Sequence, residues 1–518
     1  MRTWVKWLGW LVLSLFWLGC QASSTGERPF HLIYARSMTS LNPLFATDLT
    51  SYNFLHNIHE GLMTYDVDGE VVLGLLSSVE VSTDGLVYDF YLKEGLGFSD
   101  GMPLTMNDVY RSWMYVLDPK NSAPFAHLFD VIVGAKAFRL GESGETPAID
   151  LLSDYHMRVQ LERPFFFFLE LLTNPTFQVL HQSWLEGQAL MPRVSGAYYI
   201  DKQEQDGTMF LKANPYHYAY EEGQTLKEIK VSFVSNGSVA YQLFRQLEAD
   251  WLIRNMPLSL VRREQPNEFF HQSPANSTYF ILFNHDIPKY QDVRVRKALS
   301  IAISREDLAH LLEERPQALS YITPFGEDRP EIDQDLAKAK VLIAEAGYSK
   351  ENPLRIDYRY SSSWLDRMVA EYLQSAWQAI EGVEVRLEAI ESARYRELWR
   401  SGDFEMIRVS WVMSDYEDGE DFLRNFSKEN PFMYMRSGYH NEDFEDLLAQ
   451  ADVAENRVAR AQLLADAEKM LLLEEYAAIG LFAPYNYHLV NRAYWQGFAP
   501  NRRDIHLLRY LRKNNEDY

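Results

Sequence analysis

Residues 84–109 read DGLVYDFYLKEGLGFSDGMPLTMNDV. The first part of this stretch, residues 86–93, is rich in β-branched and aromatic side chains and follows turn-forming residues, so it predicts a β-strand. Similar runs at residues 229–234 and 277–283 predict further strands. These strands alternate along the chain with helical patterns, which indicates an α/β or α+β class.

The helical patterns are clearest in the second half of the chain. In residues 295–303 and 336–346, apolar side chains recur three and four positions apart, the spacing of one helix face. A longer helical region is predicted over about residues 443–473. The four phenylalanines at residues 165–168 are interpreted as a buried wall, with an aromatic binding platform as the alternative.

Composition excludes several classes of protein. The chain has 518 residues, of which 47% are hydrophobic and 24% charged, as expected for two to four folded domains. Its 73 acidic and 50 basic residues give a net charge of −23, which argues against a nucleic-acid partner. A single cysteine excludes an internal disulfide and a cysteine-rich metal site.

That cysteine, Cys20, follows a basic start and a short apolar run, so residues 1–19 are predicted to be a signal peptide. The sequence before it resembles the end of a bacterial lipoprotein box, in which the cysteine is acylated, for example with palmitate. Trp17 departs from the usual aliphatic residue. The alternative is a plain signal peptide followed by an incidental cysteine. If Cys20 is acylated, residues 20–29 would form a polar tether between the lipid and the folded protein.

Motifs spread along the whole chain carry a resemblance to a known family. The run FSDGMPLT at residues 98–105, followed by Asp108 and Val109, is the most specific of them, and it is accompanied by HEGL at 59–62, DVRVRKAL at 292–299 and AEAGY at 344–348. In this order they resemble the extracytoplasmic solute-binding proteins of peptide transporters, over about residues 30–510.

Several positions depart from that pattern. His59 replaces an aromatic residue, Ala197 and Gly419 replace prolines, and one extra residue lies between Trp411 and Asp415. The extra residue lies beside the expected ligand site, so it affects the details of the substrate but leaves the family unchanged.

The resemblance implies an α/β, two-lobed, periplasmic binding protein-like fold of class II type, with an inserted domain and a hinge. Lobe one would comprise about residues 28–66, 171–275 and 486–518, the inserted domain 67–170, and lobe two 276–485. Two or three strand crossings would form the hinge.

The resemblance also implies the function of a peptide-binding lipoprotein of an ABC importer, without enzymatic activity, cofactor or metal. A monomer on the periplasmic side of a bacterial membrane, or at the outer membrane or cell surface, would enclose an extended oligopeptide and pass it to permease subunits. Main-chain hydrogen bonds and bridging water would tolerate many peptide sequences.

Six residues are expected in the ligand site because they match the family's positions. Asp415 would hold the peptide ammonium group, with a helix cap or surface acid as the alternative. Arg408 would meet the peptide carboxylate, with an inter-lobe salt bridge as the alternative. The remaining expected pocket residues are Trp411, Tyr416, Tyr395 and Ser392, with simple core packing as the alternative for Trp411.

Other functions compete with this interpretation. His56, His59 and Glu60 could suggest a metalloenzyme, but their spacing matches no zinc-protease motif. The acidic run at residues 415–421 could suggest calcium, but its spacing fails the EF-hand pattern. The same fold could also bind a nickel chelate, haem, an opine or a sugar, or could serve as an adhesive or chaperone-like surface lipoprotein.

Overall fold

The computed structural model describes residues 28–46, 48–187, 193–264, 268–324, 329, 331–412, 416–428 and 437–514. The predicted signal peptide, Cys20 and Asp415 lie outside these ranges. Within them, no helix combines the length and apolar character needed to cross a membrane.

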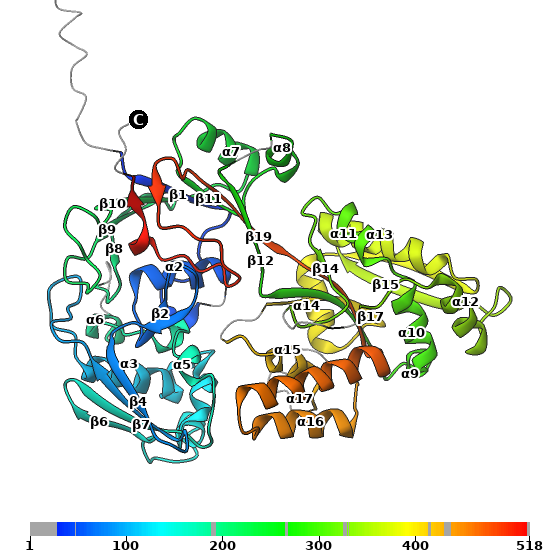
Figure 1. Cartoon of the computed structure of the whole chain (residues 1–518), viewed down its shortest axis with the longest axis horizontal. Coiled ribbons are helices and arrows are strands. Elements are labelled where there is room, and N and C mark those ends of the chain that lie inside the picture. Colours follow the sequence, from blue (N-terminus) through cyan, green and yellow to red (C-terminus); the bar gives the residue numbers. More distant parts are fainter. Residues whose placement is uncertain are drawn as a thin grey trace, which may run out of the picture.

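The first lobe is built on a seven-stranded mixed sheet (Figure 1). Its central strand β1 (Phe30–Tyr34) is buried on both faces, so that Leu32 and Ile33 point into different hydrophobic cores. From one edge to the other, the strands are β12 (Phe270–Pro274), β19 (Tyr485–Val490), β11 (Trp251–Ile253), β1, β10 (Glu228–Phe233), β9 (Met209–Ala213) and β8 (Tyr198–Gln203). Its helices include α2 (Leu49–Ile58), α7 (Gly237–Arg245) and α8 (Leu258–Arg263).

The FSDGMPLT motif lies in a smaller domain with a four-stranded antiparallel sheet. The motif ends at Thr105, which forms a capping box with Asp108 at the start of α3 (Met106–Leu117). Trp113 of this helix is fully buried in the core of the domain. The strand order is β4 (Leu76–Val81), β5 (Val87–Leu92), β7 (His156–Gln160) and β6 (Ile149–Ser153).

The second lobe holds a four-stranded sheet and a separate parallel pair of strands. The sheet order is β14 (Gln317–Ala318), β18 (Ala478–Ala483), β13 (Ser277–Phe283) and β17 (Met406–Val412), and the pair is β15 (Leu354–Ser361) and β16 (Val383–Ile390). Alternate residues of β13 enter two cores, with Ile281 in one and Phe280 in the other. Its helices include α10 (Val293–Ile301), α11 (Arg305–Leu311), α12 (Leu336–Glu345), α13 (Trp364–Gln378), α14 (Ser392–Ser401), α16 (Glu442–Asp452) and α17 (Arg457–Lys469).

Two strand crossings join the lobes. β12 of the first sheet continues into β13 of the second, and β18 of the second sheet continues into β19 of the first. The crossings are antiparallel neighbours, and the Ala275 N–H donates to the carbonyl of Pro484 at 3.0 Å between them. This pair of connections is the hinge expected from the sequence.

Local predictions agree with these elements, with one correction. The three predicted strands correspond to β5, β10 and β13, and the two shorter predicted helices correspond to α10 and α12. The correction concerns the helical region predicted over about 443–473, which is divided into two helices, because α16 ends at Asp452 and α17 begins after Asn456. The Asn456 side chain accepts from the N–H of Ala459, so it starts a new helix instead of continuing the old one.

Candidate functional site

A cavity of about 640 Å³ lies between the two lobes. The first lobe contributes Tyr52, Arg254 and Tyr487 to its wall, and the second lobe contributes Tyr279 and Ser410. Both hinge crossings also line it, at Ala275 and Pro484. Opening or closing the hinge would therefore open or close this cavity.

One wall of the cavity is an edge strand with polar backbone groups directed outward. The Tyr395 hydroxyl on α14 donates to the Arg408 carbonyl at 3.0 Å and accepts from the Arg408 N–H at 3.1 Å. Both backbone groups of Arg408 therefore point away from β13. Because every second residue of an antiparallel strand has the same orientation, the N–H and C=O of Ser410 point outward too. An extended chain could pair with β17 at this edge.

Arg408 lies on the same face of β17 as Ser410, behind Tyr279. Its guanidinium forms an ion pair with Asp366 of α13 and lies 4.6 Å from the centre of the Tyr279 ring. Only 11% of its side chain is exposed. Burial alone would lower the pKa of Arg408, but the Asp366 carboxylate outweighs this effect and raises it. Arg408 thus already has a carboxylate partner within its own lobe.

The other expected site residues occupy different places. Trp411 points to the opposite face of β17 from Ser410, packs on a core of the second lobe and donates to Asp421 at 3.3 Å. The ring of Tyr395 is buried in the same core. Asp415 lies outside the described residues, three positions after Val412, which lines the cavity. The backbone of Ser392 begins α14, and its side chain is not described.

Tyr416 lies in a contact between the lobes. Its ring stacks on Phe167 with 5.1 Å between ring centres and meets Phe165 edge-on at 5.4 Å. Phe168 is buried in the core of the inserted domain, so the predicted aromatic wall packs both within that domain and against the second lobe.

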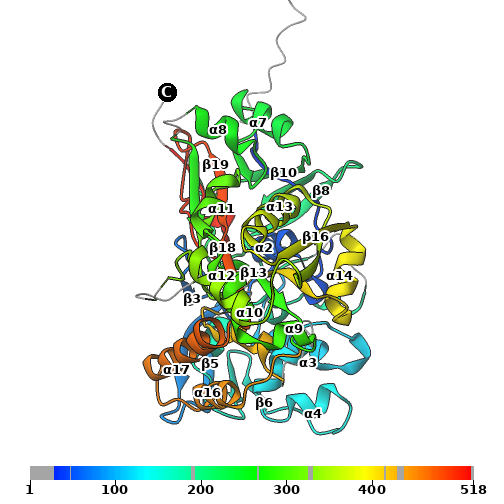
Figure 2. The same cartoon turned by 90° about the vertical axis from the view of Figure 1, so that its right-hand side faces the viewer.

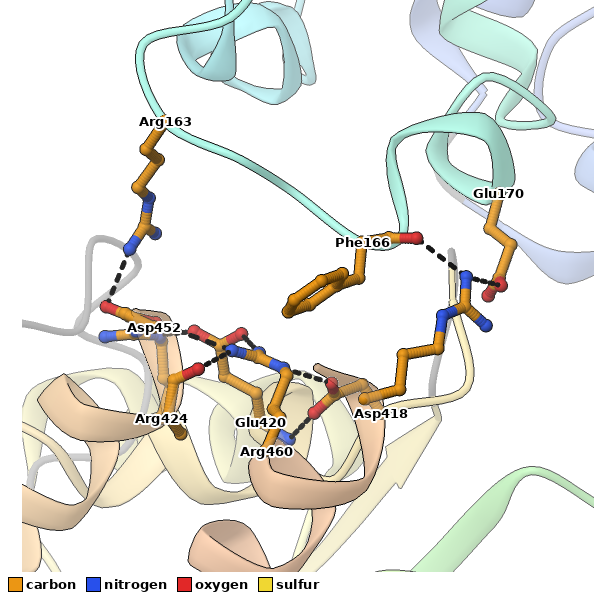
Figure 3. A network of polar contacts seen from close by, with 10 residues as sticks. Arg163, Phe166, Glu170, Asp418, Glu420, Arg424, Asp452 and Arg460 are labelled. Carbon is orange, nitrogen blue, oxygen red and sulfur yellow. Dashed lines mark hydrogen bonds and ion pairs between the residues drawn. The ribbon is translucent and has the colours of Figure 1, made fainter. Parts of the chain in front are cut away.

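Ion pairs extend this contact, which we call the latch. Arg457 of α17 donates to the carbonyl of Phe166 at 2.7 Å and to Glu170 at 3.1 Å, and its guanidinium lies 4.6 Å from the Phe167 ring centre. Arg163 pairs with Asp452 at 3.0 Å (Figure 3). Figures 1 and 2 both place the inserted domain and helices α16 and α17 at the same end of the molecule.

The described part of the acidic run after residue 415 is largely neutralised by arginines. Arg460 pairs with Asp418 at 2.6 Å and also with Glu420, while Arg424 pairs with Glu420 and with Asp452 at 2.5 Å (Figure 3). These ion pairs hold the second-lobe side of the latch. They explain the described acidic residues of the run at 415–421 without a calcium ion.

The histidines near residue 60 are part of the core. The ring of His59 is fully buried and meets Trp184 edge-on at 5.3 Å, and burial lowers its pKa to about 3. Burial likewise lowers the pKa of His56 to about 4. Glu60 pairs with Arg509 and with His217 at 3.0 Å. These contacts make the three residues a structural group.

A second histidine cluster, unrecognised in the sequence, includes His488 of β19. His488, Asp504 and His506 offer ligand atoms within 4.8 Å of one another. However, the Trp251 indole donates to His488 Nδ1 at 3.2 Å, so the His488 proton is on Nε2, which donates to Asp504 at 2.7 Å. Arg254 also pairs with Asp504 at 2.7 Å. This bonding fixes β19 and opposes metal binding.

Most of the first-lobe cavity residues carried no sequence signal. Tyr52, Arg254 and Tyr487 are far apart in the chain and belong to no recognised motif. They become neighbours only when the sheet and hinge are assembled.

Comparison with known proteins identifies the family. Residues 70–434 match the profile of the bacterial extracellular solute-binding proteins, family 5 Middle. The chain is 26% identical over 477 residues to the oligopeptide-binding protein OppA of Bacillus subtilis (strain 168), covering 87% of each chain. It is also 28% identical over 458 residues to the probable deoxycholate-binding periplasmic protein YgiS of Escherichia coli (strain K12), covering 83% of this chain and 84% of that protein.

A solved structure agrees with this assignment. The crystal structure of a periplasmic oligopeptide-binding protein of Borrelia burgdorferi (OppAIV) is similar with a TM-score of 0.79 and 26% identity, covering 94% of this chain and all of that one. The sequence is thus similar to these proteins along most of its length, and the structure has two lobes, a hinge and a cavity between the lobes. The chain belongs to the bacterial extracellular solute-binding proteins of family 5.

Proposed function

We propose that this protein is the substrate-binding lipoprotein of a peptide ABC importer. It encloses an extended oligopeptide in the cavity between its lobes and delivers it to permease subunits in the membrane. It acts as a monomer on the periplasmic side, anchored through Cys20, and performs no chemical reaction on its ligand.

The observation that carries this proposal is the outward-facing backbone of β17 in the cavity wall. The N–H and C=O groups of Ser410 can pair with any peptide backbone regardless of its side chains. Tyrosine rings around this edge, such as Tyr52, Tyr279 and Tyr487, offer apolar surface together with hydroxyl groups. The similarity to oligopeptide-binding relatives supports the same ligand class.

Within this proposal, Asp415 is the partner of the peptide ammonium group. Arg408 would bind a peptide carboxylate only if it shared its guanidinium with Asp366. Tyr395 acts by fixing the edge of β17, while Trp411 and Tyr416 support the second-lobe side of the site and the latch. Ser392, at the start of α14, is retained as a pocket residue on the family resemblance alone.

Binding of Ala-Ala-Ala and of N-acetyl-Ala-Ala-Ala, measured by calorimetry, tests the proposal. The wild-type protein is expected to prefer the free amine by about tenfold or more, because the charged pair forms in a closed cleft. Asp415→Asn should remove this preference and leave the acetylated peptide unaffected. A preference that survives in Asp415→Asn would remove Asp415 from the site.

A second ligand class is an amphipathic, non-peptide solute. It is favoured by the aliphatic part of the cavity wall, including Leu49, Met256 and Leu365, and by the relative named as probably deoxycholate-binding. Native mass spectrometry of the purified protein distinguishes the two classes. A family of co-purifying masses that fragment as peptides supports the first, and a single non-peptide mass supports the second.

A further inference from the structure

The cavity wall beside α8 is acidic. Two consecutive carboxylates, Glu313 and Glu314, line it between α11 and β14. Leu258, Pro316 and Tyr487 also line the cavity. This part of the cavity therefore combines apolar surface with negative charge.

Hydrogen bonds hold the backbone of the two glutamates in place. Arg262 donates to the carbonyls of both residues, at 2.7 Å for Glu314. The Tyr487 hydroxyl also donates to the Glu314 carbonyl. Arg262 thus directs its hydrogen bonds to the main chain, although its positive charge stays near the carboxylates.

The two carboxylates differ in what binds them. Glu313 accepts from the N–H of Ser259 at 2.9 Å. In the part of the chain that the structure describes, the Glu314 carboxylate takes part in no ion pair, and its hydrogen bond comes from its own backbone N–H. Burial raises the pKa of Glu314, which shows that its charge is poorly solvated in this wall. A cation brought by the ligand would relieve that cost.

Two other charged groups of the cavity, Asp48 and Arg254, already have partners. The Asp48 carboxylate accepts from the N–H of Ser51 at 2.9 Å, at the start of α2. Arg254 is paired with Asp504. Glu314 is therefore well placed to respond to the charge of a ligand.

We propose that Glu314 receives a basic side chain of the bound peptide, so that the protein prefers peptides that contain lysine or arginine. The aliphatic part of such a side chain would lie along Leu258 and Pro316, with its cationic end at the Glu314 carboxylate, because Arg262 already covers the ring of Tyr487 at 5.8 Å from its centre. This inference rests on the peptide-binding function proposed above.

Calorimetry with matched peptides tests it. The probes are alanine tripeptides and pentapeptides carrying one lysine at each position in turn, together with counterparts that carry uncharged norleucine. At one or more positions, the wild-type protein should bind the lysine peptide about tenfold or more tightly than the norleucine peptide. Glu314→Gln should abolish this difference and change norleucine affinity by less than about twofold.

Glu306→Gln is the control, because it removes an equal charge from an exposed position on α11. It should retain the discrimination, and thermal unfolding of both variants checks their folding. Equal binding of lysine and norleucine peptides by the wild type, or discrimination that persists in Glu314→Gln, would overturn the role of Glu314 while leaving peptide binding intact. Binding of no peptide from either series would overturn the proposed function and this inference together.

Discussion

Buried histidines give this protein a strong expected dependence on pH. Burial lowers the pKa of His59 to about 3 and the pKa values of His56, His271 and His506 to about 4, from an ordinary value of 6.5. These rings stay neutral in the folded protein at pH values where the unfolded chain would protonate them. Each one therefore makes the folded state less stable as the pH falls below about 6.5.

His59→Phe tests this effect at a single position. Phenylalanine keeps the edge-on contact with Trp184 and cannot take up a proton. Between pH 6 and pH 4, the free energy of unfolding should fall less steeply in the variant, by about 1.4 kcal/mol per pH unit. Urea unfolding at a series of pH values measures the slope. Identical slopes for the two proteins would mean that His59 is protonated equally in both states.

Among the elements, β17 has a special position, because it is the edge of its sheet and a wall of the cavity. The Tyr395 hydroxyl satisfies the backbone of Arg408, and the exposed edge begins at Ser410. Tyr395 of α14 thus sets the position along β17 after which the outward backbone N–H and C=O groups are available for pairing.

Tyr395→Phe should uncover the capped part of the edge. The ring still fills the core, but the N–H and C=O of Arg408 lose their partner, so we expect a loss of about 1–2 kcal/mol in the free energy of unfolding. Hydrogen exchange should accelerate at the Arg408 amide and stay slow at Val409, whose amide faces β13. Unchanged exchange at Arg408 would contradict the capping role.

The elements also show how far the sequence could predict this structure. β5, β13, α10 and α12 follow from local patterns, because each buries one or both faces with a regular period. The break between α16 and α17 depends on one cap at Asn456, within a continuous helical pattern. Tyr416 belongs to the latch, and Glu314 lines the cavity, because of contacts between segments far apart in sequence. Local sequence patterns carry no information about such contacts.

At the scale of the whole molecule, the cavity has contacts between the lobes on two sides. The hinge crossings join the lobes covalently at Ala275 and Pro484, and the latch joins the inserted domain to α17 through non-covalent contacts. Since the contacts of the latch can separate when the lobes move apart, the stability of the latch helps to set the balance between open and closed states.

Arg457→Ala should shift that balance toward the open state. The change removes the bonds to Phe166 and Glu170 and the contact with the Phe167 ring, none of which contributes to a core within one lobe. Because Arg457 is partly exposed, we expect ligand affinity to weaken by only about two- to fivefold. The ligand-free variant should have a larger radius of gyration in small-angle X-ray scattering, with little change in the free energy of unfolding.

Lys469→Ala, on the same helix, is the matched control, because Lys469 pairs with Glu474 within its own lobe. If Arg457→Ala and Lys469→Ala had the same affinity and the same radius of gyration, the latch would have no part in closure.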